Sequence, residues 1–526
     1  MRQSSPAAQG DWWAKLARLI DSQSALHLTP VAGLLPELQR DGDVPLADQI
    51  ARFYRCAIED GRVAAGDRLP PIRELAAACS VTRATVQAAY RRLQDRGLVE
   101  GAVGRGTVVL AGGVGGGGGA GGSRTLSPYA EAALRRMAMP GAPALPDGHD
   151  AVANFAELAP DQGLFPVDEW RAAMDDVLRR QGRRLLGYGH STFGLEELRG
   201  LLAARAHASD PALTAADVLV TAGAQQALDL ALRTVCSPGD TVVVTTPSYH
   251  HMHGLLRAHG LQVAQVAFGA DGLDLAQFAR LLARPSVRLC YLMPTFHNPT
   301  GRTLDLTQRR RLVDALAGTD VVVVEDEYQQ SLRCRGEALP SLRSLDPRGR
   351  TITVSTVSKD LFPALRIGWV AGASGMLQPM AAVKRFMDLE TSPLLQAALV
   401  EFMRRGSHDR HLDAVRTELR RRHEVLQAAC AEHLPDGCTV TDPDGGFAVW
   451  LELPASGQGE QLADLAAERG VRVVPGSAFD VDGAPSRGVR LSLTRADPEQ
   501  IERGVRVLAA CIRELLHANV ATQPFL

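Results

Sequence analysis

From residue 218 onward, short apolar runs alternate with amphipathic stretches. Six strand-like runs predict strands, at 218–221, 241–245, 261–267, 287–292, 321–324 and 351–354. Helical patterns separate these runs, so we expect an α/β domain with a mostly parallel sheet. A later run, 489–493, predicts a strand with an inward-facing arginine, Arg490. The stretch 445–452 is expected to start the sheet of a smaller lobe.

A different pattern, with apolar residues every three or four positions, fills residues 45–110 and predicts short helices. The third of these is expected to begin at Thr82, a residue type that caps helix N-termini. Its buried stripe would leave Arg83 and Thr85 exposed near its start. A β-hairpin is expected at 99–110. Two short helices joined by a tight turn, with polar side chains at the start of the second, form the helix-turn-helix that enters the major groove of DNA.

Glycine dominates the stretch 111–127, which predicts a flexible linker. It contains G-x-G-x-x-G, but no helix pattern follows, so we do not expect a dinucleotide site there. The domain organisation is therefore an N-terminal extension at 1–44, a DNA-binding domain at 45–110, the linker, and a large domain at 128–526. Within the extension, residues 11–26 predict an amphipathic helix with two adjacent tryptophans.

Composition restricts the remaining possibilities. The net charge of the 526 residues is −2, so a surface for nucleic acid must be local. Eight cysteines show neither a C-x-x-C pair nor zinc spacing, and three histidines at 250–253 lack a carboxylate at ligand spacing, so no metal is expected. Scattered free thiols are typical of a reducing compartment. No apolar run reaches 18 residues and no export signal is found, so we expect a cytoplasmic protein without a membrane span.

The turn after the strand 351–354 carries the strongest chemical signal. It contains Lys359, one of only three lysines in the chain, and Arg366 follows seven residues later. Thr356 and Ser358 add two hydroxyl groups. A fixed cation and hydroxyls suit a phosphate dianion, and a lone lysine beside them suits an amine that acts as a nucleophile.

Other strand ends supply the remaining groups that pyridoxal 5′-phosphate (PLP) needs. They are the turn 223–226 for the phosphate, Tyr249 for stacking, Asn298 and Tyr328 for the phenolate oxygen, and a carboxylate in the run 325–327 for the protonated pyridine nitrogen. In a parallel sheet these strand ends meet at one edge. The ordered set therefore predicts PLP as the cofactor.

Three motifs in the N-terminal module resemble the GntR-type winged helix-turn-helix. The family patterns G-x-L-x-x-G-x-x-L-P-x-x-R-x-L-A, V-S-R-x-T-V-x-x-A-Y-x-x-L and G-x-G-T-x-V stand at 61–76, 81–93 and 104–108, with Thr82 in place of the usual serine. The resemblance implies four DNA contacts, which are Arg73, Arg83, Thr85 and Arg105.

Residues 154–515 resemble a fold-type I aminotransferase domain, and most of all the MocR/GabR regulators. The motifs lie at 164–170, 188–199, 325–328, 358–369 and 411–426. The single residue between Asp326 and Tyr328 is typical of these regulators. The resemblance implies that Lys359 is the catalytic lysine that bonds to PLP and that Asp326 pairs with the ring nitrogen. It implies that the phosphate is bound by Ala224, Gln225, Thr356, Ser358 and Arg366. It also implies that Arg490 binds the carboxylate of an effector, and that the protein is a homodimer that reads a repeated DNA operator.

We therefore expect a PLP-dependent transcriptional regulator whose aminotransferase-like domain senses an amino compound or PLP itself. One alternative is a working aminotransferase with an accessory winged helix, because the site is chemically complete. Another is a repressor whose sensor has lost PLP and binds a different metabolite. Retention of every cofactor position argues against this last alternative.

Overall fold

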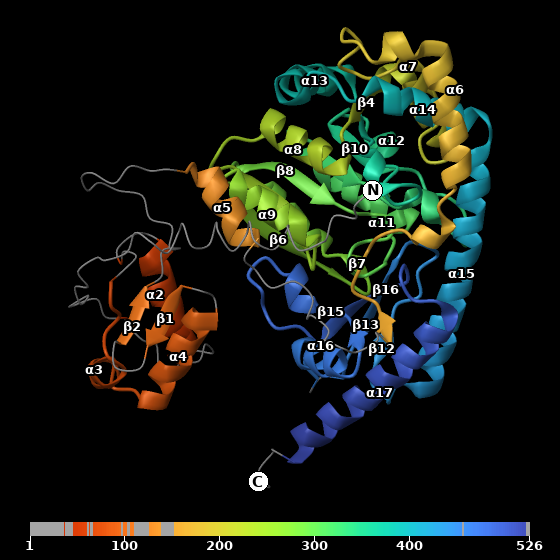
Figure 1. Cartoon of the computed structure of the whole chain (residues 1–526). Helices are drawn as coiled ribbons and strands as arrows, with labels where there is room; N and C mark the ends of the chain where they lie inside the picture. The colour runs from red at the N-terminus through yellow and green to blue at the C-terminus, as the bar shows by residue number, and fades with distance from the viewer. Residues whose placement is uncertain are drawn as a thin grey trace, which may run out of the picture. The chain divides into compact units, whose positions relative to one another are not determined.

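The computed structural model describes Pro36, Val63 and the residues 46–59, 67–95, 98–102, 106–109, 126–137, 152–454 and 457–521 (Figure 1). The chain divides into two compact units, Met1–Thr125 and Leu126–Leu526. The helix expected at 11–26 and the glycine-rich linker lie outside the described residues.

The first unit is a three-helix module with a hairpin. Its elements are α2 (Leu46–Glu59), α3 (Ile72–Ala78), α4 (Arg83–Asp95), β1 (Val99–Ala102) and β2 (Gly106–Val109). The strands β1 and β2 pair antiparallel, with Val99 opposite Val109. Apolar side chains at three- and four-residue spacing form one core, including Ile50, Tyr54 and Leu75. The predicted helices and hairpin are confirmed.

A tight turn at Cys79 and Ser80 joins α3 to α4, and Ser80 adopts a left-handed conformation with φ of +53°. The expected cap is present, because the backbone N–H of Thr85 donates to Thr82 Oγ1 at 3.2 Å. The predicted stripe on α4 is buried in the core. This arrangement leaves Arg83 exposed at the start of the second helix of the helix-turn-helix.

The second unit is built on an eight-stranded sheet. Its strands are β4 (Val218–Thr221), β5 (Thr241–Thr246), β6 (Gln262–Gly269), β7 (Gly272–Leu273), β8 (Val287–Leu292), β9 (Val322–Asp326), β10 (Thr351–Thr356) and β11 (Gly368–Ala371). They lie in the order β4-β11-β10-β9-β8-β5-β6-β7. The pairs from β10 through β9, β8 and β5 to β6 are parallel, whereas β11 and β7 run antiparallel to their neighbours. All six predicted strands are present with ends within two residues, and β7 and β11 are additional.

Helices cover both faces of this sheet (Figure 1). We call this sheet and its helices the larger lobe of the second unit. Its helices are α5 (Pro128–Met137), α6 (Val167–Leu185), α7 (Glu196–Arg205), α8 (Ala224–Val235), α9 (His250–Ala258), α10 (Leu275–Leu282), α11 (Leu306–Leu316), α12 (Leu342–Leu345), α13 (Ser374–Asp388) and α14 (Pro393–Arg404). Val242 and Val244 of β5 pack toward α8 and α9, whereas Val243 packs toward α10 and α11. Because strand residues alternate between faces, both sides of β5 must be apolar, as its sequence shows.

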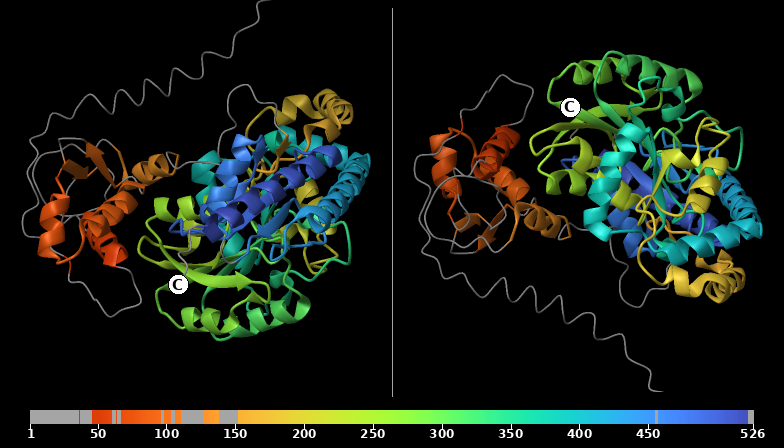
Figure 2. Two further views of the ribbon diagram at one scale, coloured as in Figure 1. Left: turned by 90° about the horizontal axis from the view of Figure 1, so that it is seen from below. Right: turned by 90° about the horizontal axis from the view of Figure 1, so that it is seen from above.

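The smaller lobe has its own antiparallel sheet, in the order β12-β13-β16-β15. The strands are β12 (Thr439–Val440), β13 (Ala448–Glu452), β15 (Val474–Pro475) and β16 (Gly488–Ser492). The helices α15 (Ser407–His433), α16 (Gly459–Glu468) and α17 (Pro498–Ala521) pack around them. A separate short strand, β14 (Val471–Arg472), pairs with β3 (Ala153–Asn154). The strand with the buried Arg490 is confirmed. The stretch 445–452 holds β13, but β12 precedes it. Figure 2 shows this lobe in blue against the green elements of the larger lobe.

Helix α5 packs on α9 at the beginning of the second unit. The Tyr129 ring meets the ring of His259 edge-to-face, with centroids 5.4 Å apart. The guanidinium of Arg233 lies 5.8 Å from the centre of the same tyrosine ring. The two residues that contact the Tyr129 ring are connected through Asp229, which is paired with both Arg233 and His259. These contacts fix α5 on the surface formed by α8 and α9.

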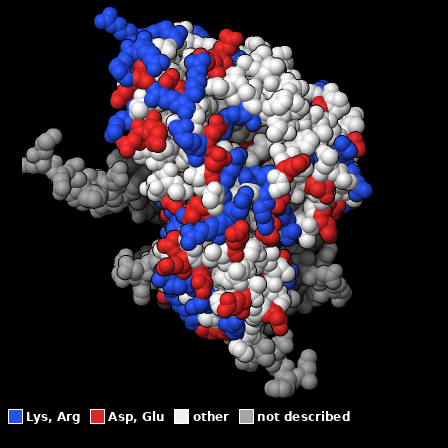
Figure 3. Space-filling model, turned by 90° about the vertical axis from the view of Figure 1, so that its right-hand side faces the viewer, with Lys and Arg blue, Asp and Glu red and all other residues white. Residues whose placement is uncertain are grey.

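The face that carries α6 and α15 has a mixed charge pattern, with arginines and carboxylates interspersed (Figure 3). Several of them form ion pairs, such as Arg205 with Asp409 at 2.5 Å and Arg416 with Asp413 at 3.5 Å. Exposed pairs of this kind contribute about 0–1 kcal/mol each. Within the described part of the chain, no helix is both long and apolar enough to cross a bilayer.

Candidate functional site

A cavity of about 170 Å³ lies at the carboxyl ends of the parallel strands in the larger lobe. All ten residues predicted to bind the cofactor line it, namely Ala224, Gln225, Tyr249, Asn298, Asp326, Tyr328, Thr356, Ser358, Lys359 and Arg366. The apolar side chains of Leu158, Leu228 and Met293 complete the wall. The fold thus brings together residues that are spread over 143 positions of the sequence, from 224 to 366.

Lys359 lies in the turn after β10, and its Nζ donates to the carbonyl oxygen of Leu158 at 2.7 Å. Burial lowers the pKa of this amine to about 8, aided by the positive charges of Arg490 and Arg366, while Asp326 acts in the opposite direction. The amine is therefore neutral more often near neutral pH than that of an ordinary lysine. A neutral amine has the free electron pair that a nucleophile needs.

Asp326 ends β9 with its side chain buried. Its Oδ2 accepts a hydrogen bond from the hydroxyl of Tyr291 at 2.7 Å, whereas its Oδ1 has no hydrogen-bond partner among the described residues. Burial raises the pKa of the carboxyl to about 6. A buried acceptor without a donor is costly. The protonated ring nitrogen of PLP is a donor of the right charge, so this residue fits the cofactor.

A narrow cradle for an anion forms where β4 turns into α8 and β10 into β11. Gly223 has φ of +93°, and a Cβ built there would lie 2.5 Å from Arg366 Nη2. A Cβ on Gly368 would lie 2.7 Å from the backbone carbon of Gly223. Glycine is thus required at both positions. Arg366 itself is left-handed, with φ of +51°, and its Nη2 donates to Ala222 O at 3.2 Å.

Hydroxyl and backbone N–H groups complete this cradle. The hydroxyl oxygens of Thr356 and Ser358 lie 2.9 Å apart. Helix α8 begins at Ala224, so the N–H groups of Ala224 and Gln225 belong to its first turn and have no intrahelical acceptor. Together with the Arg366 cation, they suit a phosphate dianion.

Asn298 connects the cavity to the smaller lobe. Its Oδ1 accepts a hydrogen bond from Nη1 of Arg490 at 3.3 Å, which leaves its amide N–H groups as donors. Arg490 is buried, does not itself line the cavity, and also donates to Ala156 O at 2.5 Å. Burial lowers the pKa of its guanidinium to about 10, so it stays cationic at neutral pH.

The two aromatic residues of the set are both largely buried. Burial raises the pKa of the Tyr249 and Tyr328 hydroxyls, and the nearby Asp326 carboxylate adds to both shifts. Both phenols therefore remain protonated and can donate. Tyr328 donates to Phe296 O at 3.3 Å, a long bond that a better acceptor can replace.

The residues expected to contact DNA lie in the first unit. Arg73 on α3 and Arg83 on α4 are exposed, and Thr85 is partly exposed with its hydroxyl 2.8 Å from that of Thr82. Arg105 lies outside the described residues. In the described ranges, no group of three histidine, cysteine, aspartate or glutamate side chains could hold a metal ion.

Two contacts of the cavity were not predicted from the sequence. The hydroxyl of Tyr291 reaches Asp326 from the neighbouring strand β8, and the backbone of Leu158 receives Lys359 from a segment before the sheet. Tyr291 occurs in a predicted strand. Its role depends on the pairing of β8 with β9, which apolar patterning does not specify.

A PLP-type cavity in one unit and a helix-turn-helix in the other define a class of protein, the DNA-binding regulators with an aminotransferase-like domain. Family models agree with this division. "Aminotransferase class I and II" matches residues 152–508, and "Bacterial regulatory proteins, gntR family" matches residues 46–109. PLP is the cofactor of the aminotransferase class I and II family.

Similar proteins span either the whole chain or its larger unit. A "Probable rhizopine catabolism regulatory protein MocR" from Rhizobium meliloti is 30% identical over 91% of this chain and 96% of its own length. "Aromatic-amino-acid aminotransferase 1" from Thermococcus litoralis is 30% identical over 69% of this chain and 88% of its own. The solved kynurenine aminotransferase of Pyrococcus horikoshii is 29% identical, with a TM-score of 0.66, over 70% of this chain and 92% of its own. The chain belongs to the MocR family of transcriptional regulators.

Proposed function

We propose that the second unit of this regulator binds PLP in the cavity around Lys359 and senses a small amino compound there. The observation that carries the proposal is the convergence of all ten predicted residues on one cavity beside a lysine with a lowered pKa. When bound, PLP supplies an electrophilic carbon that reacts with primary amines.

Each group of the cavity has a distinct task in this proposal. Arg366, Thr356, Ser358 and the first turn of α8 bind the phosphate, and Tyr249 stacks on the ring. Asp326 holds the proton of the ring nitrogen, while Asn298 and Tyr328 donate to the phenolate oxygen. Lys359, whose pKa is lowered, would supply the neutral amine that bonds to the cofactor.

Arg490 is the proposed carboxylate receptor of the effector. Its planar guanidinium suits a carboxylate, and its bond to Asn298 holds it next to the cavity. The ligand would change DNA binding only through a difference in its affinity for two arrangements of the protein. PLP is the alternative effector.

A homodimer that binds a repeated operator in the cytoplasm is the proposed acting form. The support is the helix-turn-helix, whose dimers read two half-sites through the start of the second helix. Arg73, Arg83, Thr85 and Arg105 are the proposed contacts. They belong to the motifs of the GntR family match.

The cofactor is tested by incubating the protein with PLP, reducing it with borohydride and measuring its mass. Reduction makes a lysine–PLP bond permanent. We expect the added mass on the wild type and on Lys384→Arg, which removes the other described lysine, but not on Lys359→Ala. Added mass on Lys359→Ala would contradict the assignment.

The regulator function is tested by mobility shifts on duplex DNA from the upstream region of the protein's own gene. At low salt we expect binding by the wild type and a change in its affinity when PLP and an amino compound are both present. The second candidate, a working aminotransferase, is favoured by the completeness of the cavity. Rapid turnover with 2-oxoglutarate, together with no DNA binding at low salt, would establish that candidate instead.

A further inference from the structure

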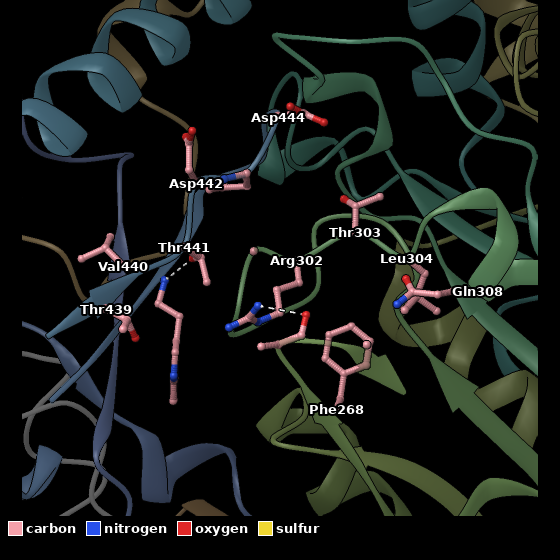
Figure 4. Close-up of a pocket in the computed structure, with 15 residues that line it drawn as sticks. Phe268, Arg302, Thr303, Leu304, Gln308, Thr439, Val440, Thr441, Asp442 and Asp444 are labelled. Atoms are coloured by element: carbon pink, nitrogen blue, oxygen red, sulfur yellow. Dashed lines mark hydrogen bonds between the residues drawn. The ribbon is translucent and has the colours of Figure 1, made fainter. Parts of the chain in front are cut away.

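A second cavity, of about 410 Å³, lies between the two lobes of the second unit, and we call it the inter-lobe cavity (Figure 4). It shares no lining residue with the cavity around Lys359. The larger lobe contributes Phe268, Arg302 and Thr303, and the smaller lobe contributes residues 439–444 and Trp450. A cavity of this size at a junction of two lobes is a typical place for a small ligand.

Arg302 is the cation of the inter-lobe cavity. Figure 4 shows it between Phe268 and residues 439–442. Its guanidinium makes only a long contact to Ala270 O, at 3.5 Å, and no ion pair with a carboxylate is found for it in the described part of the chain. The side chain is partly buried, so it has lost some hydration without gaining a charged partner. A carboxylate would provide that partner through two parallel hydrogen bonds.

The other polar side chains of the inter-lobe cavity include hydrogen-bond acceptors, so they favour a ligand that also carries hydrogen-bond donors. Asp442 and Asp444 are half exposed at its edge, and their charges are balanced by Arg335 and Arg333 from outside the lining. The hydroxyls of Thr303 and Thr439 accept or donate as needed. A small acid with hydroxyl groups at its other end satisfies both parts of the lining.

The loop that carries Arg302 also carries Asn298. His297 receives a hydrogen bond from Gly301 N on its carbonyl oxygen, at 2.6 Å, and donates its own N–H to Arg302 O at 2.8 Å. The His297 ring bonds to Thr300 Oγ1 at 2.9 Å and stacks on Phe268. These bonds make residues 297–302 one rigid loop, with Asn298 in the Lys359 cavity and Arg302 in the inter-lobe cavity.

The same loop is attached to the smaller lobe. Thr441 Oγ1 donates to Thr300 O at 2.9 Å and accepts from Trp450 N at 2.9 Å. A Cβ on Gly301 would lie 2.3 Å from Ala448 O, so the loop and β13 pack without spare room. A ligand that moves Arg302 against the smaller lobe therefore also displaces Asn298.

We propose that the inter-lobe cavity is a second ligand site, which takes a small hydroxycarboxylate on Arg302 and transmits its binding to Asn298 through the loop 297–302. Binding at Arg302 is independent of the proposed function. The transmission rests on the proposed PLP site, and the two are measured separately.

The binding step is tested by calorimetric titration of the full-length protein with gluconate, malate and citrate, which lack the amine that Lys359 chemistry requires. Glucose, which lacks the carboxylate of gluconate, is the control ligand. We expect at least one acid to bind. We expect its affinity to fall about tenfold or more in Arg302→Gln and less in Arg302→Lys, which keeps the charge but loses the planar fork.

Arg310→Gln is the matched control protein, because Arg310 is exposed on α11 outside the lining. Its affinity should equal that of the wild type. The site is wrong if none of the three acids binds, or if the acid binds Arg302→Gln, confirmed as folded by circular dichroism, as tightly as the wild type.

The transmission is tested by measuring PLP dissociation with and without a saturating amount of the acid that binds. We expect a shift of about threefold or more in the wild type, which Arg302→Gln abolishes, for a coupling on the order of 1 kcal/mol. An unchanged PLP affinity would contradict the proposed transmission to Asn298, but not the proposed binding of an acid at Arg302. A wild type that binds the acid but never binds PLP would instead contradict the proposed function.

Discussion

Asn298 and Arg490, which are 192 positions apart in the sequence, are joined by a hydrogen bond of 3.3 Å from the guanidinium to the amide oxygen. The asparagine belongs to the loop after β8 in the larger lobe, and the arginine to β16 in the smaller lobe. The bond turns the asparagine so that its N–H groups are available to the cavity. A ligand carboxylate bound to Arg490 would therefore act on the same guanidinium that orients Asn298.

Replacement of Arg490 should separate recognition of the carboxylate from recognition of the amine. In Arg490→Lys the planar fork is lost, so we expect L-alanine to bind the PLP-loaded protein about 10- to 100-fold more weakly. Ethylamine, which has no carboxylate, should bind as it does to the wild type. The measurement is the change in visible absorbance on titration. An equal loss for both amines would show that Arg490 only maintains the structure.

Asp326→Asn should stabilise the cofactor-free protein at neutral pH and weaken PLP binding. Burial raises the pKa of Asp326 from 3.8 to about 6 in the folded protein. The folded state therefore binds this proton more tightly than the unfolded state, and the carboxyl destabilises the fold as pH rises from about 4 to above 6. The difference amounts to at most about 3 kcal/mol at pH 7.

Chemical denaturation of the wild type and Asp326→Asn at pH 5 and pH 7 measures this effect. Glu327, whose pKa burial also raises, is present in both proteins, so the comparison isolates Asp326. We expect the stability gap between the two proteins to widen from pH 5 to pH 7. A gap that does not depend on pH would contradict the assigned shift.

Gly368→Ala should abolish the anion cradle. Its new Cβ would meet the backbone carbon of Gly223 at 2.7 Å, and backbone atoms of the turn between β4 and α8 cannot move aside as a side chain can. We expect PLP retention after desalting to be lost. Gly200→Ala on α7 is the control, since its Cβ would meet nothing within 4 Å. That change should leave PLP binding intact and stabilise the helix by about 0.5–1 kcal/mol.

Arg83→Ala should weaken DNA binding much more than the change of an arginine at the other end of the same helix. Arg83 is exposed at the start of α4, where a recognition helix meets base edges, so we expect a loss of about 1–3 kcal/mol. Arg91→Ala, also exposed but two turns further along, is the control. Mobility shifts at several salt concentrations measure both. Equal losses for the two variants would indicate a purely electrostatic contact.

Local patterning predicted the large sheet and the residue types of the site, but not the contacts between distant segments. The six strands were recognisable because each is a largely apolar run of four to seven positions between helical patterns. In contrast, β12 and β15 have two residues each, too few to show a period, and β11 starts just after the left-handed Arg366. The inward position of Arg490 followed from its strand.

The hydrogen bond between Arg490 and Asn298 could not be predicted from the sequence, because it depends on how the two lobes pack. For the same reason, the inter-lobe cavity could not be predicted from the sequence. Arg302 directly follows the sequence N-P-T-G. That it has no ion-pair partner among the described residues becomes visible only in the folded chain, where residues 439–444 line the same cavity.

The packing of α5 on α9 has a mechanical consequence. Helix α9 begins directly after Tyr249, which lines the cavity around Lys359, and ends next to His259, which touches Tyr129 of α5. Helix α9 thus extends from the wall of the cavity around Lys359 to the contact with α5, which is the first described helix of the second unit. A displacement of α9 at its Tyr249 end would therefore be passed on to α5 through the contact of His259 with Tyr129.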